Sequence, residues 1–256
     1  MTIEIFYVMM FFILGTIMGS FYNVVGYRLP NGMSLIKPAS HCPNCNKKLG
    51  IMELIPIVSY IIQLGKCKKC KQKIAMFYPI FEFATGVLFA ISYLVFGFTG
   101  ELIVALTFVS TLLIVMISDI KYMIIPDELL LFSGVMLVIE RLMTGSEIGG
   151  LLLDAVLPFL ILLLIKLFGD LLFRKESLGG GDIKLMVIFG LALGWQSAIL
   201  AVVIGAFIAL PVSLLILAIK KTNVIAFGPF LSIAALIIYY FKIDYLVIID
   251  KLIIGG

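Results

Sequence analysis

The sequence predicts an all-α polytopic membrane protein with about eight transmembrane helices. Hydrophobic residues occupy 62% of the 256 positions and charged residues only 13%, with a mean hydropathy of +1.21. Soluble domains carry about 25% charged residues, so this chain cannot build an ordinary water-exposed surface. Its apolar residues also fall in runs close to the ~20 residues that cross a bilayer. The net charge of +4 is concentrated in particular loops, which does not indicate nucleic-acid binding.

The first apolar segment, residues 4–27, has no small-residue cleavage pattern and is expected to remain as a transmembrane helix. A polar insert follows over residues 28–78. Its run Leu54–Leu64 is too short to cross the membrane and favours a re-entrant or interfacial helix. The tail, residues 242–256, mixes apolar and charged residues and is expected to lie on the outer surface. The remaining candidate spans cover residues 79–97, 101–118, 128–143, 148–168, 183–195, 198–219 and 228–241.

Charge sets the expected orientation. The insert contains many lysines and one acidic residue, Glu53. Cytoplasmic loops of membrane proteins are enriched in Lys and Arg, so the insert is expected in the cytoplasm and the N-terminus outside. Alternating eight spans from that point brings the loops at residues 119–127 and 169–182 to the cytoplasmic face as well.

Four cysteines form two pairs, Cys42-Pro-Asn-Cys45 and Cys67-Lys-Lys-Cys70. Two such knuckles are typical of a structural zinc ion held by four thiolates. The alternatives are a redox pair, which normally needs one knuckle in a thioredoxin-like context, and disulfides, which a cytoplasmic location disfavours. His41 adjoins the first knuckle but is not needed as a ligand.

Two aspartates lie at the ends of predicted helices. Asp182 follows three glycines, which permit a sharp turn or the close approach of another peptide, and it either caps the next helix or serves a function that justifies a carboxylate at a membrane segment. Asp119 lies near the carboxyl end of its predicted helix, where the macrodipole disfavours negative charge. Asp127 follows Pro126 and is expected to cap the helix that begins at residue 128.

Taken together, these features resemble the type IV prepilin peptidases, which belong to the Gly-x-Gly-Asp class of intramembrane aspartyl proteases. The matching pieces run in order along nearly the whole chain. They are Gly19-Ser-Phe-Tyr-Asn-Val-Val-Gly-Tyr-Arg-Leu-Pro30, the cysteine knuckles, Glu53-Leu-Ile-Pro56, Tyr78-Pro79 with Glu82, Asp119 with Pro126-Asp127, and Gly179-Gly-Gly-Asp182.

The resemblance implies a bacterial enzyme of the cytoplasmic membrane. Its substrates would be type IV prepilins or pilin-like proteins, whose basic leader it cleaves at the cytoplasmic face before N-methylating the new N-terminus with S-adenosylmethionine. The implied organisation is a first transmembrane helix (1–27), a zinc-binding insert with the methyltransferase region (28–78), an aspartyl peptidase domain (79–241) and an interfacial tail (242–256).

The implied catalytic pair is Asp119 and Asp182. On helix-end grounds alone, we expect Asp182 to hold the negative charge and Asp119 the proton. Gly179, Gly180 and Gly181 would either give the substrate backbone close access or simply permit the turn.

The methyltransferase site is implied by the resemblance alone, since no nucleotide fingerprint follows a strand. Its candidate cofactor-binding residues are Asn23, Arg28, Glu53, Lys66 and Glu82. The family pattern often has an arginine before the Tyr-Pro pair, where this chain has Phe77.

A different class of function stays open: a non-enzymatic transporter or assembly scaffold with a zinc-binding cytoplasmic lobe. Asp154, Lys166 and Asp170 could mark a polar pathway in such a protein, or they could simply reach the membrane interface.

Overall fold

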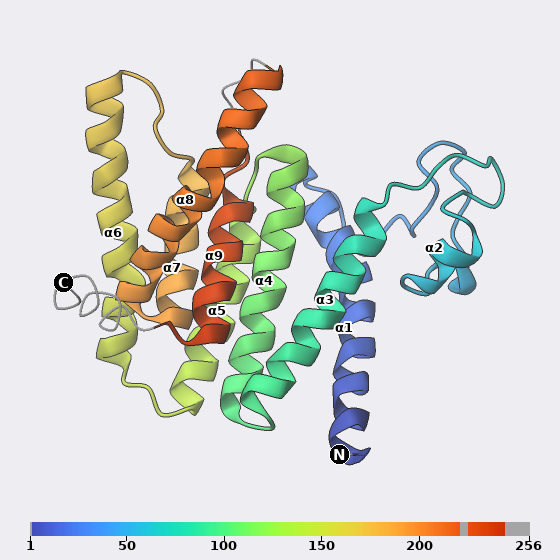
Figure 1. Cartoon of the computed structure of the whole chain (residues 1–256), viewed down its shortest axis with the longest axis horizontal. Coiled ribbons are helices and arrows are strands. Elements are labelled where there is room, and N and C mark those ends of the chain that lie inside the picture. The colour runs from blue at the N-terminus through green and yellow to red at the C-terminus, as the bar shows by residue number, and fades with distance from the viewer. Residues whose placement is uncertain (1, 221–224, 244–256) are drawn as a thin grey trace. The chain divides into compact units, whose positions relative to one another are not determined.

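The computed structural model describes residues 2–220 and 225–243, which form helices and loops with no β-strand among them. The chain divides into two compact units, Met1–Phe98 and Thr99–Gly256, whose helices are labelled in Figure 1.

The first unit is built on two long helices, α1 (Thr2–Arg28) and α3 (Phe77–Phe96). They pack closely because glycines line their contact. A Cβ on Gly15 would lie 2.8 Å from the Cα of Gly86, and a Cβ on Gly19 would lie 2.7 Å from the Thr85 hydroxyl. Small residues allow membrane helices to approach in this way.

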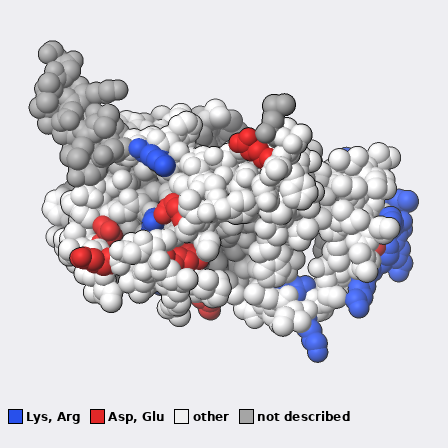
Figure 2. All heavy atoms as spheres, turned by 90° about the horizontal axis from the view of Figure 1, so that it is seen from below, with Lys and Arg blue, Asp and Glu red and all other residues white. Residues whose placement is uncertain are grey.

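The insert between these helices is mostly loop. It contains the 3-10 turns η1 (Leu29–Asn31) and η2 (Ile51–Glu53) and the short helix α2 (Val58–Ile62). The buried Arg28 side chain organises its start by donating to three backbone carbonyls, those of Ser34, Leu35 and Pro38, at 2.6–3.2 Å. Lysines and arginines gather over the insert, whereas most of the helical surface seen in Figure 2 is uncharged.

Among its described residues, the second unit has six helices, with α4 (Gly100–Tyr122) at the centre. The side chains of Phe108, Leu112 and Val115 on α4 are completely buried. The helices that follow are α5 (Asp127–Met143), α6 (Ile148–Phe173), α7 (Gly180–Leu193), α8 (Trp195–Lys220) and α9 (Gly228–Phe241). Helices α5, α7 and α9 pack against α4, while α6 and α8 pack against α7 and expose most of their length, as Figure 1 shows for α6.

A polar cluster, which we call the clasp, joins four helices at one end of this unit. It consists of Glu101, Arg141 and Tyr239. Arg141 binds Glu101 at 2.6 Å and donates to the carbonyls that end α7, those of Leu191 and Ala192. The Tyr239 hydroxyl donates to the other Glu101 oxygen at 2.7 Å. The clasp therefore holds the start of α4 against the ends of α5, α7 and α9.

All eight predicted segments are helices, although their bounds differ. Helix α7 begins at Gly180 rather than residue 183, and α6 continues to Phe173. Within the described part of the chain, five helices are long and apolar enough to cross a membrane, namely α1, α3, α4, α6 and α8. Helices α5, α7 and α9 have 17, 14 and 14 residues, so the fold is that of a polytopic membrane protein while the count of eight spans stays a prediction. Residues 244–256 of the predicted tail lie outside the described residues.

Candidate functional site

The structure brings Asp119 and Asp182 together. Asp119 lies in the last turn of α4 and Asp182 in the first turn of α7, at the end of the unit opposite the clasp. Both are buried, with 6% and 8% of their surface exposed, and their carboxylates are close enough for the charge of one to act on the other. Two buried carboxylates in one place are costly unless they share a proton, so this pair has the character of a functional site.

Asp182 does not cap its helix. The N-cap residue of α7 is Gly179, and no side chain caps this end. Among the described residues, no donor makes a hydrogen bond to the Asp182 carboxylate. The capping alternative considered for the sequence is therefore excluded, which leaves the carboxylate available for chemistry.

Asp127 also differs from its prediction. The N-cap of α5 is Pro126, and Asp127 is the first helical residue. Its two carboxylate oxygens instead each accept from the Lys184 ammonium at 2.7 Å. Both partners are largely exposed, at 66% and 51% of their side chains, so this ion pair contributes little stability.

The three glycines before Asp182 have different surroundings. A Cβ on Gly181 would lie 2.9 Å from Cβ of Ile125, which precedes α5. A Cβ on Gly179 would lie 3.0 Å from the Asp182 carboxylate, whereas Gly180 faces open space. All three lie outside the left-handed region of backbone conformation. The turn itself therefore does not require glycine, and the need at Gly179 and Gly181 is for space.

Gly228 is a site residue that the sequence argument missed. Its backbone N–H donates to the Asp119 carboxylate at 2.8 Å, in a buried contact. Gly228 is the first residue of α9, and Pro229 follows it. A glycine and proline before an apolar run do indicate the start of a helix. Nothing in the sequence indicates that this start meets a residue 109 positions earlier.

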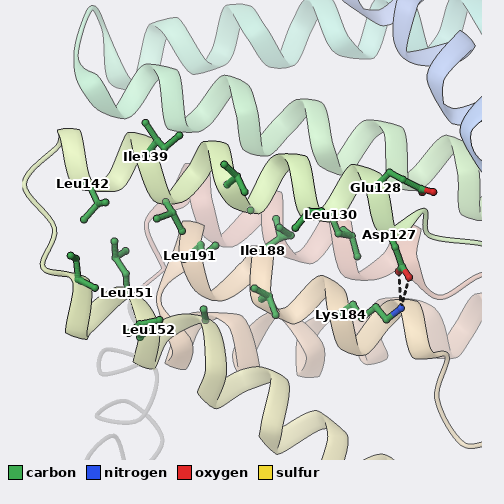
Figure 3. A pocket seen from close by; sticks show the side chains of 17 residues that line it. Asp127, Glu128, Leu130, Ile139, Leu142, Leu151, Leu152, Lys184, Ile188 and Leu191 are labelled. Atoms are coloured by element: carbon green, nitrogen blue, oxygen red, sulfur yellow. Dashed lines mark hydrogen bonds and ion pairs between the residues drawn. The ribbon is translucent and has the colours of Figure 1, made fainter.

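An apolar hollow of about 920 Å³ lies between α5, α6 and α7. Figure 3 shows the Asp127–Lys184 ion pair at one end of it and Leu142 and Leu151 at the other. Asp119 and Asp182 do not line this hollow. Lys184 and Asp182 are two positions apart, which places them about 200° apart around α7. The hollow and the carboxylate pair thus lie on different faces of that helix.

The four cysteines form a cluster in the first unit. All four sulfurs lie within 4.8 Å of one another, with Cys42 and Cys70 at 3.8 Å and Cys45 and Cys67 at 3.9 Å. Zinc–sulfur bonds of about 2.3 Å in a tetrahedron place sulfurs roughly 3.8 Å apart. The arrangement therefore fits a metal ion, as the sequence predicted. The exposed His41 ring contacts the carbonyl of Ala39 and is not part of the cluster.

Hydrogen bonds to some of these sulfurs lower the thiol pKa and so favour the thiolate form that binds a cation. The backbone N–H of Gln72 and the side chain of Asn44 lower the pKa of the Cys70 thiol to about 6. At Cys45 the backbone hydrogen bond of Lys47 lowers the pKa, but burial and the three neighbouring thiols raise it to about 11. Four thiolates would repel one another without a metal, so a divalent ion would displace the remaining protons.

Two family models match the sequence of this chain. The bacterial peptidase A24 N-terminal domain matches residues 13–96, which include the cysteine cluster. The type IV leader peptidase family matches residues 106–214, which include both buried aspartates. The chain belongs to the type IV leader peptidase family.

Several members of this family are similar over most of the chain, and each bears the name prepilin leader peptidase/N-methyltransferase. The protein of Bacillus subtilis (strain 168) is 37% identical over 236 residues, covering 90% of this chain and 92% of the relative. The protein of Pseudomonas aeruginosa is 31% identical over 87% of this chain and 86% of its own length. That of Pectobacterium carotovorum is 31% identical over 86% and 88%. No solved structure matches the chain at a significant level.

The cofactor-binding residues predicted for this leader peptidase each have a local partner or an exposed position. Glu53 binds Lys47 at 2.7 Å, and this hydrogen bond lowers the pKa of the Glu53 carboxyl. Arg28 binds the loop carbonyls described above, and Lys66 is exposed.

Asn23 lies on α1 and Glu82 on α3, the two helices that pack together in this unit. Asn23 donates to the Tyr78 carbonyl at 3.2 Å, and its side-chain oxygen is buried with no partner among the described residues. Glu82 accepts from the backbone N–H of Ile57 at 2.8 Å. The structure thus explains these residues by contacts within the unit, and their role in binding a cofactor stays a prediction.

Proposed function

We propose that this chain is an intramembrane aspartyl endopeptidase that removes the basic leader of type IV prepilins or pilin-like proteins and N-methylates the new N-terminus. The observation that carries the proposal is the meeting of Asp119 and Asp182, two buried carboxylates from different helices, at one end of the second unit. Membership of the leader peptidase family and the names of the relatives support it.

The pair can hydrolyse a peptide bond. In an aspartyl protease, two carboxylates share one proton: one accepts a proton from the attacking water, and the other protonates the departing amine. Asp119 and Asp182 lie at helix ends rather than mid-helix. An unwound peptide can find water or protein partners for its backbone groups there, which the centre of a bilayer does not offer.

The site faces the cytoplasm in our proposal, and so does the basic insert, because cytoplasmic loops collect Lys and Arg. The enzyme is then a multi-pass protein of the bacterial cytoplasmic membrane with its N-terminus outside. Zinc held by the four cysteines would fix the two knuckles of the insert against each other.

Methylation belongs to the first unit in this proposal, and S-adenosylmethionine would supply the methyl group. The proposed cofactor residues are Asn23, Arg28, Glu53, Lys66 and Glu82. Four of these residues, Asn23, Arg28, Glu53 and Glu82, already bind other parts of the chain.

The test uses the purified full-length protein and a prepilin. Asp119→Asn and Asp182→Asn should each abolish leader removal. The matched control is Asp127→Asn, an aspartate at the same end of the unit that binds Lys184 and not the pair; it should cleave at the wild-type rate. Cleavage that persists in both single variants would contradict the protease mechanism, and label transfer from methyl-labelled S-adenosylmethionine to the cleaved product tests the second activity.

The transporter alternative has less support. Asp154 accepts from the backbone N–H of Trp195 at 3.1 Å. Asp170 accepts from the backbone and hydroxyl of Ser177 at 2.7 and 2.8 Å, with Lys166 at 3.7 Å. These polar groups of α6 therefore serve local contacts rather than a pathway.

A further inference from the structure

The two aspartates differ in what surrounds them. Asp119 lies at the carboxyl end of its own helix but receives the backbone N–H of Gly228 from the start of α9, at 2.8 Å. The first N–H groups of a helix have no partner within the helix, and the amino end of a helix favours a negative charge. From its place at the carboxyl end of α4, Asp119 was expected to hold the proton. The amino end of α9 instead favours the negative charge on Asp119.

Asp182 lies in the first turn of α7, where the helix dipole favours a negative charge. However, no donor among the described residues binds its carboxylate directly. A direct hydrogen bond to a charged group is stronger than the diffuse field of a helix end. When two buried carboxylates share one proton, the carboxylate that accepts a hydrogen bond is the one that stays ionised.

Among the described residues, no charge other than that of the pair itself acts clearly on either carboxylate. The first turn of α9 contains no acidic residue. The Lys184 ammonium on α7 is bound to Asp127 on α5. The other ionisable residues near these helix ends include Lys121 and Tyr122 on α4 and Glu128 on α5.

We propose that Asp119 holds the negative charge and acts as the base, that Asp182 holds the proton, and that Gly228 is the positioning residue that maintains this assignment. The inference rests on the proposed peptidase activity. Asp119 takes a proton from the water molecule while the water oxygen attacks the scissile carbonyl carbon. Asp182 gives its proton to the amine as the carbon–nitrogen bond breaks, and transfer of the proton from Asp119 to Asp182 restores the pair.

Gly228 is suited to this role because it has no side chain. A Cβ at this position would lie 2.8 Å from the bound oxygen of Asp119 and 3.3 Å from its carboxyl carbon. Gly228→Ala therefore pushes the carboxylate away from the amide that stabilises its charge. Gly205→Ala on α8 is the matched control, because its Cβ would press on Leu231 of the same helix α9 at 3.1 Å, away from Asp119.

The first experiment is the pH dependence of kcat/KM for prepilin cleavage. The acidic limb reports the group that must be ionised. In Gly228→Ala it should move to higher pH by about one unit, the effect of losing roughly one hydrogen bond to a charged group, while Gly205→Ala keeps the wild-type limb. An unmoved limb in Gly228→Ala, or an equal movement in both variants, overturns the proposal. If wild-type protein cleaves no prepilin, the proposed function fails instead.

The second experiment needs neither activity nor the Gly228 variant. Infrared difference spectra of wild type minus variant, taken on the full-length protein at neutral pH, detect the C=O band of a protonated carboxyl group that a substitution removes, because the buried Glu82 and Glu140 are common to both proteins and cancel. We expect this band to disappear in Asp182→Asn and to persist in Asp119→Asn. Loss of the band in Asp119→Asn and its persistence in Asp182→Asn would assign the proton to Asp119 and refute the inference.

Discussion

Gly181→Ala should impair catalysis by crowding the start of α7. The new Cβ would lie 2.9 Å from Cβ, 3.2 Å from Cγ1 and 3.3 Å from Cδ1 of Ile125. Carbon atoms pack best at about 3.5–4.0 Å, so the two segments must separate by roughly 0.6 Å or more. The Ile125 Cβ is fixed to the backbone and cannot move aside alone. Overpacking of this kind costs about 1–3 kcal/mol.

Asp182 is the next residue, so the same displacement moves its carboxylate. A misplacement of about 1 Å can lower a rate by roughly 100-fold. We therefore expect kcat for prepilin cleavage to fall by roughly 10- to 100-fold. The thermal midpoint should fall by about 2–12 °C, since 1 kcal/mol corresponds to about 2–4 °C in a chain of this size.

Gly180→Ala is the control in the same segment, because nothing lies within 4 Å of its Cβ position. It should keep the wild-type kcat and thermal midpoint, and a raised KM alone would show that the substrate backbone passes close to it. Kinetics on cleavage of a purified prepilin, with melting curves on the same samples, measure both effects. The crowding argument is refuted if Gly181→Ala behaves as wild type, or if Gly180→Ala loses as much kcat as Gly181→Ala.

Three further changes test other parts of the structure. Cys42→Ser should lower the bound zinc from about one ion per chain to near zero, measured by metal analysis, and full retention of zinc would exclude the four-cysteine site. Arg141→Met should lower the free energy of unfolding by about 2 kcal/mol, less than for a fully buried pair because the Arg141–Glu101 contact is partly exposed; an unchanged melting curve would show that the clasp is dispensable. Glu82→Gln replaces a charged acceptor with a neutral one, a loss of about 1 kcal/mol, and should speed hydrogen exchange of the Ile57 amide by about fivefold, whereas an unchanged exchange rate would mean that this contact does not hold the insert.

The helices could be predicted because the membrane leaves the backbone few options. An apolar run of sufficient length must satisfy its own N–H and C=O groups, and a helix does so within the segment. The start of α7 was placed three residues late because glycines carry no apolar pattern and disfavour helices on average. The cysteine cluster was predictable for another reason. The spacing of two cysteines within each knuckle is visible in the sequence and is typical of a metal site.

The charge assignment at the candidate site was not predictable in the same way. The sequence places Asp119 at the end of one helix, but the amide that binds it comes from α9. The contact between Arg141 on α5 and the carbonyl of Leu191 on α7 was likewise not predictable from the sequence. Such contacts depend on which helix faces meet, and that is decided by packing across the whole unit.

The distance along the chain between Asp119 and Gly228 has a consequence for biogenesis. Ribosomes make the chain from its N-terminus, so both aspartates are made before α9. During that interval the Asp119 carboxylate lacks the amide that binds it in the folded unit. Helix α9 is thus needed to complete the surroundings of Asp119, so the carboxylate pair reaches its final arrangement only after a segment 109 positions further along the chain has been made.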